Sequence, residues 1–472
     1  MSMLPRLQPR NYYDLVVEVA IVRPGPIQGG MVHPYLQARE RRRRGEALQL
    51  EKPELEAALA RTLGVPIFQE QVMQIAMIAA DFTPGMADDL RRSMAAWKRK
   101  GGVHRFEEPL VKGMLAKGYR PAFAQAIFQQ MLGFGEYGFP ESHAHSFALL
   151  AYASSWLKCH EPACFLAALL NALPMGFYTA SQLVQDARRH GVRVLPIDVT
   201  CSDSDCTLEG PAERLRPARG LPTPPLPQPA VRLGLCLVAG LQASATQRLV
   251  QARAAALFTS TEDLALRARL GRPDLQALAA ADALVSLSGH RRQQMWEAAA
   301  QNTAPALWRE VPVHEAPLAL PAAPEGEEIV FDYAATGLTL RRHPLALLRP
   351  RLARWRLQTA LQLHNIPHGR KVRACGIVTV RQRPGTAKGT MFVTLEDETG
   401  PVNVIVWPAL VETWRQALLG SQLLAVEGLW QCSAHGPGGQ TVVRHLVAQR
   451  CKDLTPLLGR MAQALQGSRD FH

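Results

Sequence analysis

Four basic side chains within ten residues form the first group in this sequence that could do chemistry. Arg91 and Arg92 stand in the middle of a predicted helix, and Lys98 and Lys100 follow one to two turns later. Guanidinium groups present planar, forked donors that match phosphate oxygens, and ammonium groups add compact positive charges. The cluster could therefore bind a polyanion such as a phosphate chain. Charge runs are also common on plain solvated helix faces, so spacing alone leaves both interpretations open.

The stretch that positions these cations runs from residue 63 to residue 100 and predicts two helices joined by a short break. In the first helix, Phe68, Val72 and Ile75 recur at helical spacing and predict one buried face. Pro84 and Gly85 interrupt the pattern, because proline lacks an amide donor and glycine has little helical preference. A second helix then carries the arginines.

Carboxylates spaced to hold a pair of metal ions are not apparent. Asp88 and Asp89 are adjacent, so on a helix they point about 100° apart. Asp203 and Asp205 fall in a predicted loop without a supporting strand. We therefore predict no catalytic residue and no metal ligand in this chain.

The composition favours a globular, nucleic-acid-binding class of protein. The chain of 472 residues is long enough for two to four domains, and its net charge of +13 predicts acidic partners. An arginine-rich composition also has a purely genomic explanation. The apolar region 146–173 is interrupted by Lys158, Glu161 and Pro162, which predicts a buried helix pair and no membrane partner. No secretory signal is visible, so we expect a cytoplasmic protein with reduced thiols.

A second organisation begins near residue 233. The run 233–241 followed by a predicted helix over 244–256 is typical of a helix-hairpin-helix element, whose glycine turn offers backbone amides to DNA phosphates. Gly240 would make that contact. Many such turns carry a second glycine where this chain has Gln242, which weakens the prediction of the tightest contact.

Residues 371–453 change to the alternating pattern of short strands separated by glycine turns, which predicts an OB-fold barrel. The cations Lys371, Arg373 and Arg381 lie near Phe392 in this region, and basic groups with stacking faces suit single-stranded DNA. A small barrel without any ligand is the alternative. The sequence does not indicate which of the aromatic residues Phe392, Trp407 and Trp430 are exposed.

Four motifs occur in the order typical of one known family. They are Arg23-Pro-Gly-Pro-Ile-Gln-Gly-Gly-Met31, Phe68-Gln-Glu-Gln-Val-Met-Gln-Ile75, Leu90-Arg-Arg-Ser-Met94 and Tyr137-Gly-Phe-Pro-Glu-Ser-His143. The chain resembles the bacterial C-family DNA polymerases, the alpha subunits of the replicative polymerase. The sequence after Arg23 and the ending Ser-Arg-Asp-Phe-His472 resemble the error-prone branch in particular.

The resemblance implies a multidomain fold: a mainly α fingers region and a helix-hairpin-helix domain, followed by the C-terminal OB-fold β-barrel. The expected boundaries are fingers 1–200, Pro-rich linker 201–232, helix-hairpin-helix domain 233–300, connector 301–369, OB-fold 370–455 and tail 456–472.

The resemblance also implies roles for individual residues. Arg91 and Arg92 match positions that contact the incoming triphosphate, with Lys98 and Lys100 in the basic cluster behind them. Arg23, Ser142 and His143 would position template and primer end.

In this family, Mg²⁺ is bound by palm aspartates that lie upstream of the Arg23 motif, so we expect the palm to be missing from this chain. The implied activity is DNA-directed DNA synthesis in damage-induced mutagenesis and translesion synthesis, and this chain alone is expected to be inactive. Primer–template, single-stranded template and dNTP are the implied partners, with mutasome proteins and, indirectly, a sliding clamp. A non-catalytic DNA-binding protein and a mutasome scaffold are the alternatives.

Overall fold

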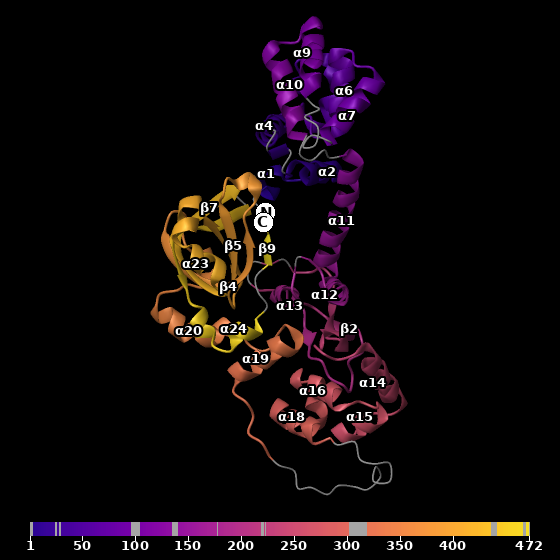
Figure 1. Cartoon of the computed structure of the whole chain (residues 1–472), viewed down its shortest axis with the longest axis vertical. Coiled ribbons are helices and arrows are strands. Elements are labelled where there is room, and N and C mark those ends of the chain that lie inside the picture. Colours follow the sequence, from indigo (N-terminus) through magenta and orange to yellow (C-terminus); the bar gives the residue numbers. More distant parts are fainter. Residues whose placement is uncertain are drawn as a thin grey trace. The chain divides into compact units, whose positions relative to one another are not determined.

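A computed structural model gives the fold of the chain, which divides into two compact units (Figure 1). The first comprises residues 1–153 with the short segments 385–389 and 432–444, and the second comprises the remainder. The structure describes residues 3–23, 26–27, 30–95, 104–134, 140–176, 178–218, 221, 223–301, 319–435, 441–465 and 469–471.

The first unit is helical in its described residues. Its helices are α1 (Leu4–Leu7), α2 (Tyr12–Ile21), α4 (Val32–Arg43), α5 (Glu56–Leu59), α6 (Gln69–Ala80), α7 (Pro84–Ala95), α9 (Glu107–Ala116), α10 (Pro121–Phe134) and the first part of α11 (Glu141–His160). The predicted apolar face of α6 forms the centre of the core, with Phe68, Val72 and Ile75 fully buried. Helix α9 packs closely on α6, because a Cβ added at Gly113 would lie 2.8 Å from the carbonyl oxygen of Ala80.

The two predicted helices around the break are confirmed as α6 and α7. Asp81 ends α6 with a left-handed φ of 55°. The hydroxyl of Thr83 accepts a 3.3 Å hydrogen bond from the amide of Met86, and Pro84 occupies the first position of α7, where a missing amide costs nothing. The proline therefore starts the second helix and sets the direction in which its arginines project.

The prediction that residues 146–173 form a buried helix pair is wrong for its first helix. Helix α11 buries only Ala144 and Ala148, while Leu149, Leu150 and Tyr152 are more than half exposed. Apolar content predicted burial, but the helix is a long rod that continues from the first unit into the second. Helix α12 (Pro162–Asn171) is buried along one face, as predicted. In the described residues, no helix is both long and apolar enough to cross a membrane.

The second unit begins with α12 and α13 (Ala180–Arg189), which pack near a three-stranded sheet in the order β1 (Val194–Leu195), β3 (Gln228–Arg232), β2 (Thr207–Glu213). β3 runs parallel to β1 and antiparallel to β2. Two of these strands lie in the stretch that we predicted to be a Pro-rich linker. Prolines concentrate in the connection between β2 and β3, whereas the flanking alternation of Ala230 and Val231 pairs and is buried.

A helical group follows, with α14 (Ala243–Ala255), α15 (Thr261–Arg267), α16 (Arg272–Ala280), α17 (Val285–Ser288) and α18 (Arg291–Ala300). Beyond it lie α19 (Glu325–Thr336), α20 (Pro344–Arg354) and α21 (Ala360–His364). The guanidinium of Arg291 is buried between α18 and α19, where it donates to Glu328 and Asp332 at 2.7 and 2.5 Å. Arg341 donates to both oxygens of Asp332 at 2.8 Å. These charges connect segments about 40 residues apart, which fixes the two helices to each other.

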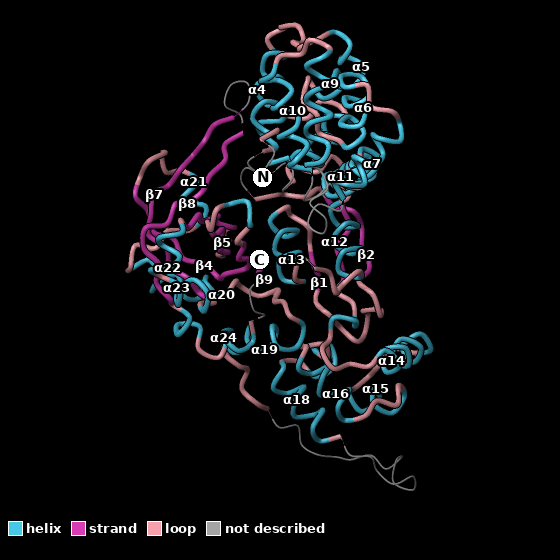
Figure 2. The backbone as a smooth tube through the Cα atoms, turned by 45° about the horizontal axis from the view of Figure 1, so that its top comes forward, coloured by secondary structure: helices cyan, strands magenta, loops and turns pink. Residues whose placement is uncertain are grey.

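The barrel is closed by five strands: β4 (Lys371–Gln382), β5 (Met391–Glu396), β6 (Pro401–Val406), β8 (Thr441–Asp453) and β7 (Leu423–His435). β4 pairs with both β5 and β7, which closes the ring, and β6 runs parallel to β8 (Figure 2). This strand order is that of an OB-fold, so the predicted barrel is confirmed. Helices α22 (Pro408–Thr413) and α23 (Arg415–Gly420) connect β6 to β7.

Residues predicted as a tail are structured in part. Helix α24 (Met461–Ala464) packs against α19, and β9 (Arg469–Phe471) pairs in parallel with β4. Met461 and Leu465 supply the apolar surface for this packing.

Candidate nucleotide and DNA interface

Arg91 and Arg92 project from α7 and remain accessible to solvent. Their side chains are 42% and 70% exposed, and both contact the same carboxylate, that of Asp88. Arg91 donates to Asp88 Oδ1 at 2.8 and 2.9 Å, and Arg92 lies 2.7 Å from Oδ2. These hydrogen bonds, that of Arg91 foremost, hold the pKa of Asp88 below its usual value. One carboxylate therefore shares two guanidiniums, and a net positive charge remains on the exposed face.

Lys98 and Lys100, the other two predicted nucleotide contacts, lie outside the described residues. Arg23 is described and lies with its guanidinium 6.0 Å from the centroid of the Phe147 ring on α11. His143, also on α11, meets the same ring edge-on at 4.6 Å. The structure thus brings Arg23 and His143 together through one aromatic side chain.

Ser142 does not cap α11, because the helix begins one residue earlier, at Glu141. The backbone amide of Glu141 donates to the Glu70 carboxylate at 3.1 and 3.2 Å. A carboxylate already occupies the start of this helix, so the dipole there is neutralised by the protein itself. Ser142 is exposed on the first turn and offers its hydroxyl from the surface.

Tyr13 reinforces this corner of the first unit. Its hydroxyl donates to Glu141 at 2.8 Å, and Arg61 lies 4.1 Å above its ring. Burial, together with the neighbouring carboxylate, raises the pKa of Tyr13 well above its ordinary value. The phenol therefore stays protonated and holds the start of α11 in place.

Gly240 lies in the turn before α14 with φ of 82°, a conformation that glycine adopts without strain. A Cβ there would meet nothing within 4 Å, so the turn is open on its outer side. The amide of Ala239 donates to the carbonyl of Ala335 at 2.8 Å, which anchors the turn to α19. Gln242 is the N-cap of α14 and makes no side-chain cap bond.

On the barrel, the predicted DNA contacts separate into exposed and buried residues. Lys371 and Arg373 on β4 are 63% and 51% exposed and share Glu427 at 3.1 and 2.7 Å. Arg381 is buried and donates to the carbonyls of Leu418 and Ser421, so it holds the barrel to the end of α23. The expectation that Arg381 faces DNA does not match this placement, because β4 turns its side chain inward at that point.

Phe392 lies on β5 and is 37% exposed, directly opposite Ile405 of β6 in the antiparallel register. Trp407, at the end of β6, is also exposed, whereas Trp430 is buried. Ile405 was missed by the sequence reasoning, although the alternation along 401–406 marks it as an outward position. The β5–β6 face is thus an apolar, aromatic patch on the barrel.

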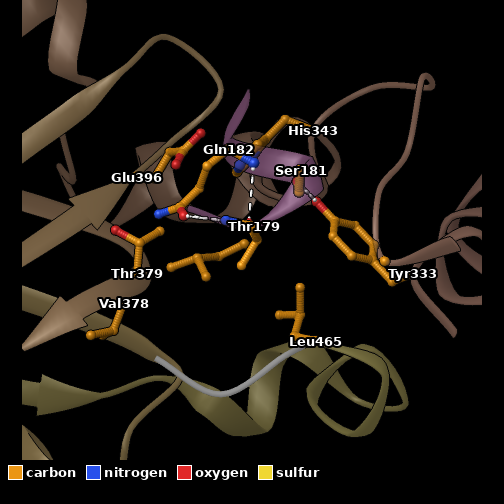
Figure 3. Close-up of a pocket in the computed structure, with 11 residues that line it drawn as sticks. Thr179, Ser181, Gln182, Tyr333, His343, Val378, Thr379, Glu396 and Leu465 are labelled. Carbon is orange, nitrogen blue, oxygen red and sulfur yellow. Dashed lines mark hydrogen bonds between the residues drawn. The ribbon is translucent and has the colours of Figure 1, made fainter. Parts of the chain in front are cut away.

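A small pocket in the second unit is unsuitable for a nucleotide. It encloses about 60 Å³ and is lined by residues that include Thr179, Tyr333, His343 and Glu396 (Figure 3). Burial lowers the pKa of His343 to about 4, and burial raises the pKa of Glu396. Ser181 and Tyr333 share a 3.3 Å hydrogen bond across one wall. These contacts describe a packed junction with room for little more than water.

The described residues hold no group of three or more His, Cys, Asp or Glu side chains that could share a metal ion. The Mg²⁺ that the polymerase family implies therefore finds no fitting donor set among them, and no chemical step is assigned to it.

Two comparisons with known families match parts of the chain. Residues 1–118 match the bacterial DNA polymerase III alpha subunit finger domain, and residues 191–294 match a helix-hairpin-helix motif. The second match begins before the predicted start at residue 233 and includes the three-stranded sheet.

Curated relatives match the chain over its whole length. It is 60% identical over 475 residues to a protein named error-prone DNA polymerase from Bordetella bronchiseptica, of which it covers 43%. The proteins of the same name from Ralstonia pickettii and Methylococcus capsulatus are 58% and 55% identical, and the chain covers 43% and 44% of them. The chain thus spans less than half the length of these relatives.

Among solved structures, asparaginyl-tRNA synthetase from Pyrococcus horikoshii matches 19% of this chain and 20% of its own, with 26% identity and a TM-score of 0.15. That similarity is too slight to bear on fold or function. The finger-domain match, the hairpin match and the full-length identity agree with the helical first unit and the closed barrel. The chain therefore belongs to the error-prone branch of the bacterial C-family DNA polymerases and corresponds to less than half of such a protein.

Proposed function

We propose that this chain holds DNA and an incoming dNTP during DNA-directed DNA synthesis past damaged template bases. The observation that carries the proposal is the placement of Arg91 and Arg92. They lie within the segment that matches the polymerase finger domain, and they are exposed with only Asp88 as a shared partner.

The two arginines would act on the triphosphate by charge. Guanidinium donors bind phosphate oxygens in pairs, and they would stabilise the negative charge that grows on the pyrophosphate as the chain is extended. Asp88 pairs with them within one helical turn, so a triphosphate can replace it without unfolding any other contact. Lys98 and Lys100 are included in this proposal as the predicted continuation of the cluster.

DNA would be held by several surfaces. Arg23, Ser142 and His143 are proposed to lie along the primer–template, and the turn at Gly240 to contact the duplex backbone. Phe392 would stack with bases of the single-stranded template, next to the exposed cations Lys371 and Arg373. We do not include Arg381, because its guanidinium is already bound inside the barrel.

The test is binding of a fluorescent primer–template by the full chain, measured with and without a dNTP across a salt series. We expect DNA binding that falls steeply with salt and tightens when the matching dNTP is added. Primer extension by the chain alone is not expected, because its described residues contain no acidic metal cluster. Extension should appear when the preceding part of a relative is supplied in trans.

The outcomes separate the proposal from its alternatives. DNA binding that is indifferent to dNTP, without extension in trans, would instead describe a non-catalytic DNA-binding protein. Absence of DNA binding would leave a scaffold that docks on other mutasome proteins.

A further inference from the structure

A groove of about 780 Å³ lies on the barrel, away from the β5–β6 patch. It is formed by the end of α20, by the outer surface of β4 and β7, by the end of β8 and by the junction of α22 and α23. Its floor is apolar, with Leu357, Val426 and Leu454 buried beneath it. The groove belongs entirely to the second unit.

Two indoles and five cations line this groove. Trp355, which is 41% exposed, and Trp414 supply the aromatic surfaces. The basic residues are Arg354, Arg356, Arg373, Arg450 and Lys452. Glu427 is the acidic residue in the lining, and Lys371 and Arg373 already neutralise it.

Most of these cations are not used by the fold. Arg354, Arg356, Arg450 and Lys452 are exposed and form no ion pair within the part of the chain that the structure describes. Arg356 also has a φ of 57°, a position after a helix where glycine is usual. An arginine held there against local preference places a charge at the rim where folding alone does not require one.

We propose that this groove binds single-stranded nucleic acid, with bases stacked on Trp355 and Trp414 and phosphates along the basic rim. The inference rests on the proposed function, since it adds a second path for a strand on the same barrel. Aromatic platforms beside a positively charged track are the features that bind single strands without regard to sequence. An acidic peptide is less suited, because β4 and β7 are each paired on both sides and offer no free edge for strand addition.

The test uses the full chain and a labelled twenty-nucleotide oligothymidylate, with binding followed by fluorescence anisotropy over a salt series. Trp355→Ala is expected to weaken binding about ten-fold. The double variant R450Q/K452Q is expected to lower the salt slope by about two, since each lost phosphate contact removes about one. The matched control R188Q/R272Q removes two exposed cations from other helices and should leave the slope unchanged.

An abasic oligonucleotide of the same length isolates the stacking part. It has the phosphates without the bases, so wild type and Trp355→Ala should bind it equally. If wild type binds oligothymidylate but both groove variants behave like the control, the groove is excluded while the proposed function stands. If poly-glutamate displaces the DNA and the abasic strand binds as well as the natural one, the groove recognises acidic charge in general and the proposal is wrong. If wild type binds no DNA at all, the proposed function itself fails.

Discussion

Two sets of arginines in this chain meet acidic partners in opposite ways. Arg91 and Arg92 on α7 contact a carboxylate three and four residues away, and both stay exposed. Arg291 on α18 is 2% exposed and meets Glu328 and Asp332, which lie 37 and 41 residues along the chain. A partner within the same helix constrains nothing else and can be exchanged for a ligand. A partner on another element commits the arginine to the fold.

Removing the buried member of this comparison should have the largest effect. Arg291→Leu would leave Glu328 and Asp332 buried with Arg341 as their remaining guanidinium partner. Loss of one partner from a buried ion pair typically costs about 3–5 kcal/mol of unfolding free energy. Denaturant unfolding followed by circular dichroism measures the change. Arg92→Leu is the control, and equal stability of the two variants would refute the distinction.

A buried histidine gives the next effect, and it depends on pH. His343 accepts a hydrogen bond from the amide of Leu345 at 3.2 Å, and burial lowers its pKa to about 4 from 6.5. Between these values the unfolded chain binds a proton that the folded chain refuses, so stability falls as the pH is lowered from about 6.5 to 4. The loss from this group is at most about 3 kcal/mol.

His343→Asn separates that contribution from other titrating groups. Asparagine caps a helix as well but does not titrate in this range. Melting temperatures measured from pH 7 to pH 4 should therefore fall less for the variant than for wild type. Parallel curves for the two proteins would show that His343 is not the group responsible.

The barrel repeats the comparison on a smaller scale. Arg381→Met would leave the buried carbonyls of Leu418 and Ser421 without their donor, at about 1–3 kcal/mol. Lys371→Met removes an exposed cation and should leave stability nearly unchanged while weakening DNA binding. Thermal unfolding and anisotropy on the same two proteins give both readouts. Weaker DNA binding by Arg381→Met at full stability would reverse the assignment.

The smallest effect on stability is expected at the exposed helix. Asp88→Asn frees Arg91 and Arg92 from their shared carboxylate, and exposed pairs of this kind contribute little to folding. Its melting temperature should match wild type, whereas affinity for a dNTP should rise several-fold because the competing charge is gone. A weaker affinity would mean that Asp88 positions the arginines and does not compete for them.

The sequence predicted the elements that depend on local pattern. Helical spacing around Phe68, Val72 and Ile75 located α6, and strand alternation located most of the barrel. Turn residues such as Pro84 also gave the right boundary, although they start a helix where we expected only a break.

What the sequence could not supply were the partners of charged side chains. Nothing in the run around Arg381 distinguishes it from Arg373, yet one is buried and the other is exposed, because a two-residue period places both outward until β4 shifts its register against β5 between Val378 and Val380. The basic groove was missed for the same reason. Its cations come from α20, β4 and β8, which only the closed barrel brings together. The run from Leu352 to Arg356, which interleaves arginine with tryptophan, was the local signal available.

The most direct test of the central claim is dNTP binding by the full chain with primer–template bound, compared between wild type and the double variant R91A/R92A. Hydrogen bonds to charged groups are strong enough that the account predicts at least a roughly ten-fold weaker affinity for the variant, with DNA affinity and melting temperature little changed. Equal dNTP affinity in the two proteins would contradict the claim that the exposed arginines of α7 hold the triphosphate.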